Sequence, residues 1–101
     1  MTQIAVGDVD IKHIGHATFL FGVQGHRILC DPYFTDRFPW GDHEEHRLTP
    51  PRVPEDEVPR PDVIFVSHAH GDHFDPAATA RLSGEETLLI APFEVLCTLE
   101  S

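Results

Sequence analysis

The sequence contains 101 residues, of which 41% are hydrophobic and 24% charged, and 17 acidic against 7 basic side chains give a net charge of −10. A chain of this length can bury one modest core, so we expect one domain and exclude a second. The composition is too apolar for a disordered segment, and no run approaches the ~20 apolar residues of a membrane span. We therefore expect a soluble globular protein. Residues 1–4 lack the pattern of a secretory leader, which favours the cytoplasm.

The acidic balance also bears on partners. Nucleic acid and anionic lipid surfaces bind proteins through clustered Lys and Arg side chains, which this chain lacks. We therefore expect no nucleic-acid partner. Cys30 and Cys97 are too few for a disulfide framework and are predicted to be small buried hydrophobic residues.

Short β-type runs separated by turn residues fill the first third of the chain and predict a meander of hairpin-linked strands. Residues 31–62 follow and hold seven of the nine prolines, so no helix or central strand can run far through them. A loop of this length in a compact domain is usually functional, and we expect this one to be so. The predicted strands of the meander are residues 4–6, 11–14, 18–23 and 27–30.

The last third of the chain alternates strands with helices. Residues 63–66 predict a strand buried on both faces, and a helix over residues 76–82 follows, with Asp75 as its N-cap. Residues 87–91 predict a second buried strand, and residues 92–99 a second helix. This order is typical of an α+β fold in which helices cover one face of a sheet. No predicted element covers the other face, so the fold looks incomplete.

Four candidate metal ligands, His68, His70, Asp72 and His73, lie within six residues directly after the strand at 63–66. His68 and His70 are two apart in extended chain and point to the same side, and the intervening glycine lets the chain turn so that Asp72 and His73 approach them. Imidazole and carboxylate suit Zn²⁺, Mn²⁺ or Fe, and the absence of Cys argues against a closed structural zinc site. A catalytic metal centre is therefore predicted. The alternative is a set of polar loop residues that cap the following helix, although capping needs only Asp75.

This arrangement resembles the metallo-β-lactamase superfamily, whose signature is His-x-His-x-Asp-His after a strand. The chain is most similar to the branch of lactonases and phospholipase-D-type phosphodiesterases, on residues 14–20, 28–32 and the proline-rich approach from 48–51 to 62–64. The resemblance implies an αββα sandwich. Residues 1–101 would be the N-terminal half of that single domain, truncated at its C-terminal end. The third histidine, the bridging aspartate and the last histidine that complete the family's site have no counterpart after His73.

The resemblance also implies a role for each matching residue. His68 and His70 correspond to ligands of a first metal ion, and Asp72 and His73 to ligands of a second, with Asp72 also assigned a catalytic role. Asp31 corresponds to a carboxylate that supports the metal loop by hydrogen bonding. His16 lies in a family motif and is expected at the rim of the active site.

The function implied for the intact family member is hydrolysis of an ester, lactone or phosphodiester bond by a metal-activated hydroxide, with zinc as the expected metal. The substrate is then a small or lipid-like molecule that lies against residues 33–60. Two alternatives stay open. The chain could be a catalytically incomplete metal-binding remnant without turnover, or a nuclease of the same fold, which the net charge disfavours.

The remaining histidines and aromatic residues favour simpler interpretations. His43 and His46, with the acidic residues beside them, are expected in a solvated loop, because their spacing is not that of a helical zinc site. His13 and His26 are expected as ordinary strand histidines. Four phenylalanines are predicted in the core: Phe19, Phe21, Phe65 and Phe93. Four aromatic residues of the long loop could either line a substrate site or pack within the loop: Tyr33, Phe34, Phe38 and Trp40.

Overall fold

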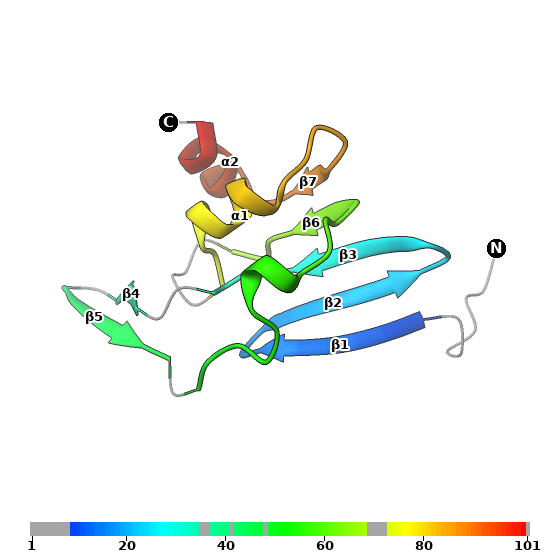
Figure 1. Cartoon of the computed structure of the whole chain (residues 1–101). Helices are drawn as coiled ribbons and strands as arrows, with labels where there is room; N and C mark the ends of the chain where they lie inside the picture. The colour runs from blue at the N-terminus through cyan, green and yellow to red at the C-terminus, as the bar shows by residue number, and fades with distance from the viewer. Residues whose placement is uncertain (1–8, 35–36, 41, 48, 69–72, 101) are drawn as a thin grey trace.

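A mixed five-stranded sheet with two helices forms the fold of the computed structural model, which describes residues 9–34, 37–40, 42–47, 49–68 and 73–100. The strand order is β1-β2-β3-β6-β7. Figure 1 shows the helices grouped beside β6 and β7, at the opposite side of the sheet from β1. The sheet strands are β1 (Val9–Gly15), β2 (Thr18–Val23), β3 (His26–Cys30), β6 (Val63–Phe65) and β7 (Leu88–Ile90).

The first three strands form the predicted antiparallel meander. Gln24 and Gly25 connect β2 to β3 and both have positive φ, at 50° and 81°. Two such residues make a tight hairpin turn whose twist matches that of the strands, and glycine adopts this conformation without steric cost. The predicted strand at residues 4–6 lies outside the described residues.

From β3 onward the sheet is parallel. Leu29 pairs with Ile64, and Ile64 pairs with Leu89. The carboxyl ends of β3 and β6 therefore meet at one edge of the sheet, which we call the carboxyl edge. In Figure 1 both arrows point to the left toward this edge, and the β2–β3 turn lies at the opposite end, the hairpin edge.

Helices α1 (Pro76–Leu82) and α2 (Phe93–Glu100) cover one face of the sheet. Asp75 caps α1 through a hydrogen bond from the backbone N–H of Ala78 to its Oδ1 (3.1 Å), as the sequence predicts. The hydrophobic core on this face combines strand, loop and helix residues: Ile14, Leu29, Val58, Ile64, Val66, Phe74, Leu82 and Val95. No helix in the described part of the chain is long and apolar enough to cross a membrane.

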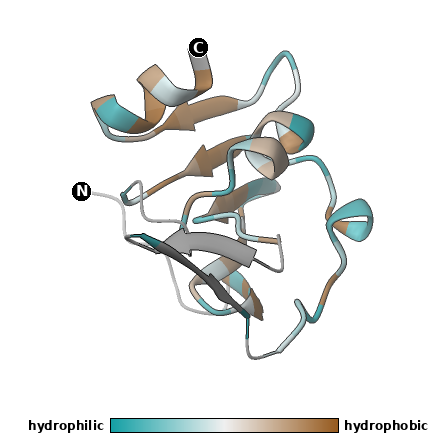
Figure 2. Ribbon diagram, turned by 90° about the vertical axis from the view of Figure 1, so that its left-hand side faces the viewer, coloured by the Kyte–Doolittle hydropathy of each residue, from teal (hydrophilic) through white to brown (hydrophobic). Residues whose placement is uncertain are grey.

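The opposite face of β6 and β7 is uncovered by the described residues. Phe65 and Ile90 are exposed, and Leu88 is 59% exposed. The prediction that both strands are buried on two faces is therefore wrong, because the helices pack on one face only. Figure 2 shows how hydrophobic these two strands nevertheless are. Their apolar runs suit a two-layer sandwich, of which this chain forms the helix-covered sheet.

Two further residue predictions are corrected. Phe93, expected in the core, begins α2 with 79% of its surface exposed, because the core-facing position of that helix belongs to Val95. Cys97 is exposed rather than buried, whereas Cys30 is half-buried at the end of β3.

The long loop between β3 and β6 is less irregular than its prolines suggest. It contains a separate two-stranded hairpin, β4 (Arg37–Trp40) and β5 (His43–His46), and a short 3-10 helix, η2 (Glu55–Glu57). Pro39 lies within β4, which is tolerated because a two-stranded ribbon leaves one side of each strand without a ladder partner. His43 and His46 therefore belong to a strand rather than to the expected loop. Their side chains are not among those that the structure describes.

Candidate metal centre

The candidate site lies at the carboxyl edge of the sheet, where three chain segments come together (Figure 1). The β1–β2 turn brings His16, the end of β3 brings Asp31, and the end of β6 brings Ser67 and His68. His73 returns to the same place just before α1. Residues far apart in the sequence thus meet because parallel strands end at a common edge.

The backbone of Asp31 is held in an unusual conformation. Its φ is 46°, in the left-handed region that Asp tolerates better than most residues. Its N–H donates to the carbonyl of Phe65 (2.8 Å), and its own carbonyl accepts from Thr18 Oγ1 (2.7 Å). Thr18 Oγ1 also accepts from the N–H of Tyr33 (3.1 Å). Strain of this kind, of order 1–3 kcal/mol, persists where surrounding bonds over-determine the geometry and is common at functional sites.

The Asp31 carboxylate accepts three hydrogen bonds. Oδ1 accepts from the N–H of Ser67 (2.7 Å), while Oδ2 accepts from Ser67 Oγ (2.8 Å) and from His73 Nδ1 (3.0 Å). Ser67 Oγ also bonds to Nδ1 of His68 (2.8 Å). A hydroxyl has one proton, and Ser67 gives it to Asp31, so His68 Nδ1 must be the donor in the second bond.

This proton arrangement fixes the tautomers of two histidines at once. His73 donates through Nδ1 to Asp31, whereas His68 donates through Nδ1 to Ser67 Oγ, which itself donates to Asp31. In the neutral imidazoles the lone pair is then on Nε2 of both rings, which is the form that binds a metal ion. Asp31 therefore fixes the tautomer of both side chains, directly for His73 and through Ser67 for His68.

The rings themselves are close together. The centroids of His68 and His73 lie 4.1 Å apart, and His16 meets His73 edge to face at 5.5 Å. His16 has a φ of 51°, and its carbonyl accepts a hydrogen bond from Nε2 of His13 (2.8 Å). The structure thus places His16 against the candidate site, where the sequence expects a rim residue.

Two of the four candidate ligands, His70 and Asp72, lie outside the described residues, so their placement stays a prediction. Within the described ranges, no three His, Cys, Asp or Glu side chains converge closely enough to hold an ion. The donor chemistry of the described pair still fits one. His68 and His73 are two adjacent imidazoles with a carboxylate behind them, which is the support that metal-binding histidines usually have.

Sequence reasoning missed the roles of Ser67 and Thr18. Ser67 connects His68 to Asp31, and Thr18 holds the Asp31 carbonyl. A serine directly before the His-rich segment is a usable signal, because a hydroxyl there can reach the neighbouring ring. Nothing in the sequence signals the contact of Thr18, since 13 residues separate it from Asp31.

The Asp31 carboxylate also influences Cys30. Partial burial raises the pKa of the Cys30 thiol above its ordinary value, and the neighbouring negative charge of Asp31 raises it further. The thiol is therefore a weaker nucleophile at neutral pH than an exposed cysteine.

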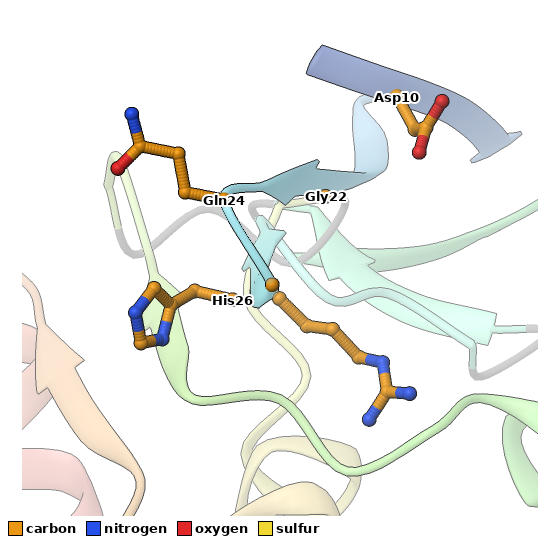
Figure 3. Close-up of a pocket in the computed structure, with 6 residues that line it drawn as sticks. Asp10, Gly22, Gln24 and His26 are labelled. Atoms are coloured by element: carbon orange, nitrogen blue, oxygen red, sulfur yellow. The ribbon is translucent and has the colours of Figure 1, made fainter. Parts of the chain in front are cut away.

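A hollow of about 440 Å³ lies at the other end of the sheet, around the β2–β3 turn. Figure 3 shows its side chains spread apart rather than pointing to a common centre. His26 there lies 3.9 Å from the Asp62 carboxylate, and both side chains are exposed. The hollow is lined by Asp10, Gly22, Gln24, Gly25, His26 and Arg27. It holds no cluster of catalytic groups, so the carboxyl edge is the better candidate site.

The fold is that of known hydrolase structures. A crystal structure from Parabacteroides distasonis, of a candidate metal-dependent hydrolase, matches with a TM-score of 0.69 at 24% identity, over 92% of this chain and 35% of that one. An isothiocyanate hydrolase from gut bacteria of Delia radicum matches with a TM-score of 0.66 at 21% identity, over 89% of this chain and 37% of that one.

Sequence comparison identifies the family. A family model described as a beta-lactamase superfamily domain matches residues 10–98. A UPF0173 metal-dependent hydrolase from Rubrobacter xylanophilus is 34% identical over all of this chain and 37% of its own length. An N-acyl-phosphatidylethanolamine-hydrolyzing phospholipase D from Caenorhabditis elegans is 34% identical over 69% of this chain and 20% of its own length. The chain belongs to the metallo-β-lactamase superfamily. It spans between about a fifth and little more than a third of the length of these two relatives.

Proposed function

We propose that the chain carries part of the active site of a metal-dependent hydrolase, with His68, His70, Asp72 and His73 as metal ligands. The observation that carries the proposal is the Asp31 network, in which His73 Nδ1 bonds to the carboxylate and His68 Nδ1 bonds to the Ser67 hydroxyl that donates to the same carboxylate. Simple helix capping would not need this arrangement. Asp75 alone caps α1, and its two carboxylate oxygens bond to Ala78 and Phe34 instead.

The chain's own residues would bind and orient the metal. His68 and His73 would contribute Nε2, and Asp31 would keep both rings in the required tautomer and orientation. His16 would pack against His73 and limit its rotation. When bound, a metal ion such as zinc supplies Lewis acidity and lowers the pKa of water toward neutrality. Zinc is our proposal because imidazole and carboxylate ligands suit it; manganese and iron would be accepted by the same donors.

The proposed substrates contain an ester, lactone or phosphodiester bond. The phosphodiester class is supported by the name of the phospholipase D relative from Caenorhabditis elegans, and hydrolysis in general by the relative from Rubrobacter xylanophilus. The net charge of −10 disfavours a polyanionic nucleic acid and favours a small or lipid-like substrate.

Metal content and hydrolysis test the proposal together. We would load the purified protein and His73→Ala with zinc or manganese, remove excess metal, and measure bound metal and turnover of bis(4-nitrophenyl) phosphate and 4-nitrophenyl butyrate. Loss of a histidine ligand should lower metal affinity by at least about tenfold. His26→Ala, at the hairpin edge, is the matched control and should bind metal like the wild type.

The results separate the interpretations. Equal metal content in His73→Ala and the wild type would overturn the ligand assignment. Metal uptake that depends on His73 without any turnover would instead support the alternative of a catalytically incomplete metal-binding chain.

A further inference from the structure

Arg47 is a half-buried cation without a carboxylate partner among the described side chains. The chain has 17 acidic residues, and the described ion pairs include Arg81 with Glu55 but none with Arg47. An arginine that is partly removed from water and left without a counter-charge is unfavourable unless an anion joins it. In a protein with a net charge of −10 this is an unexpected use of one of only seven basic residues.

The guanidinium of Arg47 is fixed in place by backbone groups. Nε donates to the carbonyl of Thr49 (2.9 Å), and Nη1 donates to the carbonyl of Tyr33 (2.7 Å). The Cζ atom lies 4.3 Å from the centre of the Tyr33 ring. Two of the five N–H donors are thus used to hold the group, and neutral carbonyls do not cancel its charge.

Gly15 makes room for this guanidinium beside the candidate metal centre. A Cβ at residue 15 would lie only 2.8 Å from Nη2 of Arg47, so an alanine there would push the group aside. Gly15 immediately precedes His16, and the His16 ring contacts both Tyr33 (6.0 Å between centroids) and His73 (5.5 Å). Arg47 therefore lies on the wall of the site, separated from His73 by the rings of Tyr33 and His16.

We propose that Arg47 forms a binding site for an oxyanion, namely a carboxylate or phosphate group of the substrate that is not the group undergoing hydrolysis. Arginine suits this role because its planar fork binds either anion through two parallel N–H donors, and here the fork is already immobilised. The choice of substrate rests on the proposed hydrolase function, but binding of the anion does not.

Anion binding can be measured without any turnover. We would titrate the metal-free, isotope-labelled protein with sodium acetate and, separately, with sodium phosphate at constant ionic strength, and follow the NMR signals of the Arg47 side chain and the Gly15 and His16 amides. Saturable shifts should occur with at least one anion, and the stronger of the two identifies carboxylate or phosphate as the preferred group. Arg47→Gln should weaken binding by at least about tenfold, because charge-assisted hydrogen bonds are lost.

Three further variants distinguish binding from a structural role. Gly15→Ala keeps every charge but displaces the guanidinium, so it should also weaken binding, whereas Arg47→Lys should retain part of it. Arg27→Gln removes the same charge at the hairpin edge and should bind like the wild type. The proposal is overturned if Arg47→Gln binds as tightly as the wild type, or if Arg27→Gln loses as much affinity.

Substrate preference provides the second readout. With metal bound, 4-nitrophenyl hemisuccinate carries a remote carboxylate that 4-nitrophenyl butyrate lacks. Arg47→Gln should raise KM for the hemisuccinate by about tenfold and change that for the butyrate by less than about threefold. If neither ester nor bis(4-nitrophenyl) phosphate is hydrolysed, the proposed function fails while the anion titration still decides the role of Arg47.

Discussion

Two histidine–aspartate pairs lie at opposite edges of one sheet, and they differ in almost every respect but composition. At the carboxyl edge, His73 Nδ1 lies 3.0 Å from Asp31, and the two side chains are 23% and 11% exposed. At the hairpin edge, His26 Nδ1 lies 3.9 Å from Asp62, and the side chains are 72% and 52% exposed. The first pair shares its carboxylate with Ser67, whereas Asp62 accepts a bond from the backbone N–H of Arg27 (2.8 Å).

The comparison shows that position in the sheet decides what such a pair can do. Parallel strands gather several chain segments at the carboxyl edge, so Asp31 accepts hydrogen bonds from Ser67 and His73 and is largely buried. Distant segments also meet at the hairpin edge, where Asp62 accepts from the backbone N–H of Arg27, but the side chains there point apart (Figure 3) and those of His26 and Asp62 are exposed. Water screens the exposed pair, so its contribution to stability should be small.

The strongest test of this difference exchanges each carboxylate for an amide. Asp31→Asn removes the charged acceptor that both histidines depend on, so metal affinity should fall by about 10–100-fold and the free energy of unfolding by about 1–3 kcal/mol. Asp62→Asn should change either quantity little, because its carbonyl oxygen can still accept from Arg27 in water. Zinc titration and urea unfolding measure both. Similar losses in the two variants would show that the carboxyl edge is not special.

A variant at Ser67 tests the part of the network that connects Asp31 to His68. Ser67→Ala keeps the N–H bond to Asp31 but removes the hydroxyl between Asp31 and His68, so the His68 tautomer is no longer fixed. Metal affinity should fall by about tenfold. Ser83→Ala is the control, since Ser83 Oγ donates only to the Thr79 carbonyl at the end of α1. Isothermal titration with zinc measures the affinity of each variant. Equal affinities in Ser67→Ala and Ser83→Ala would contradict a role of the Ser67 hydroxyl in orienting His68.

Two threonines offer a smaller, matched test of backbone support. Thr18 Oγ1 joins Asp31 and Tyr33 at the carboxyl edge, and Thr87 Oγ1 joins Gly84 and Pro61 before β7. Replacement of either by Val should lower the free energy of unfolding by about 1–3 kcal/mol, because partners that are buried at Thr18 and partly buried at Thr87 lose their hydrogen bonds. Only Thr18→Val should also weaken metal binding, by several-fold, since it releases the Asp31 backbone. Equal metal affinity in the two variants would contradict this.

The smallest expected effect concerns the cysteines. Burial and the charge of Asp31 raise the pKa of Cys30, so at pH 8 less of it is thiolate, and its alkylation should be slower than that of the exposed Cys97. Mass spectrometry after iodoacetamide treatment measures both rates in one sample. Raising the pH should narrow the gap, and Asp31→Asn should accelerate Cys30. Faster reaction of Cys30 in the wild type would contradict the effect of burial.

Much of the fold was predictable because local patterns carry it. Strand alternation and the Gln24-Gly25 turn predicted β1 to β3, and Asp75 before Pro76 predicted the start of α1. The predictions failed where they depended on what covers a surface. Phe65 and Phe93 are apolar enough for a core, but their exposure depends on which face the helices cover, which no local window contains.

The sequence was sufficient to predict the family, the meander and the position of His68 and His73 soon after β6, because spacing along a short segment constrains these features. Only the tertiary structure showed that Asp31 accepts hydrogen bonds from His73 and from Ser67, and that Ser67 Oγ in turn bonds to His68. It also showed that Arg47 packs on Tyr33 beside His16. These contacts join residues up to 42 positions apart. They exist because parallel pairing brings distant strand ends to one edge, and the free energy of such pairing depends on the whole sheet rather than on any neighbouring residues.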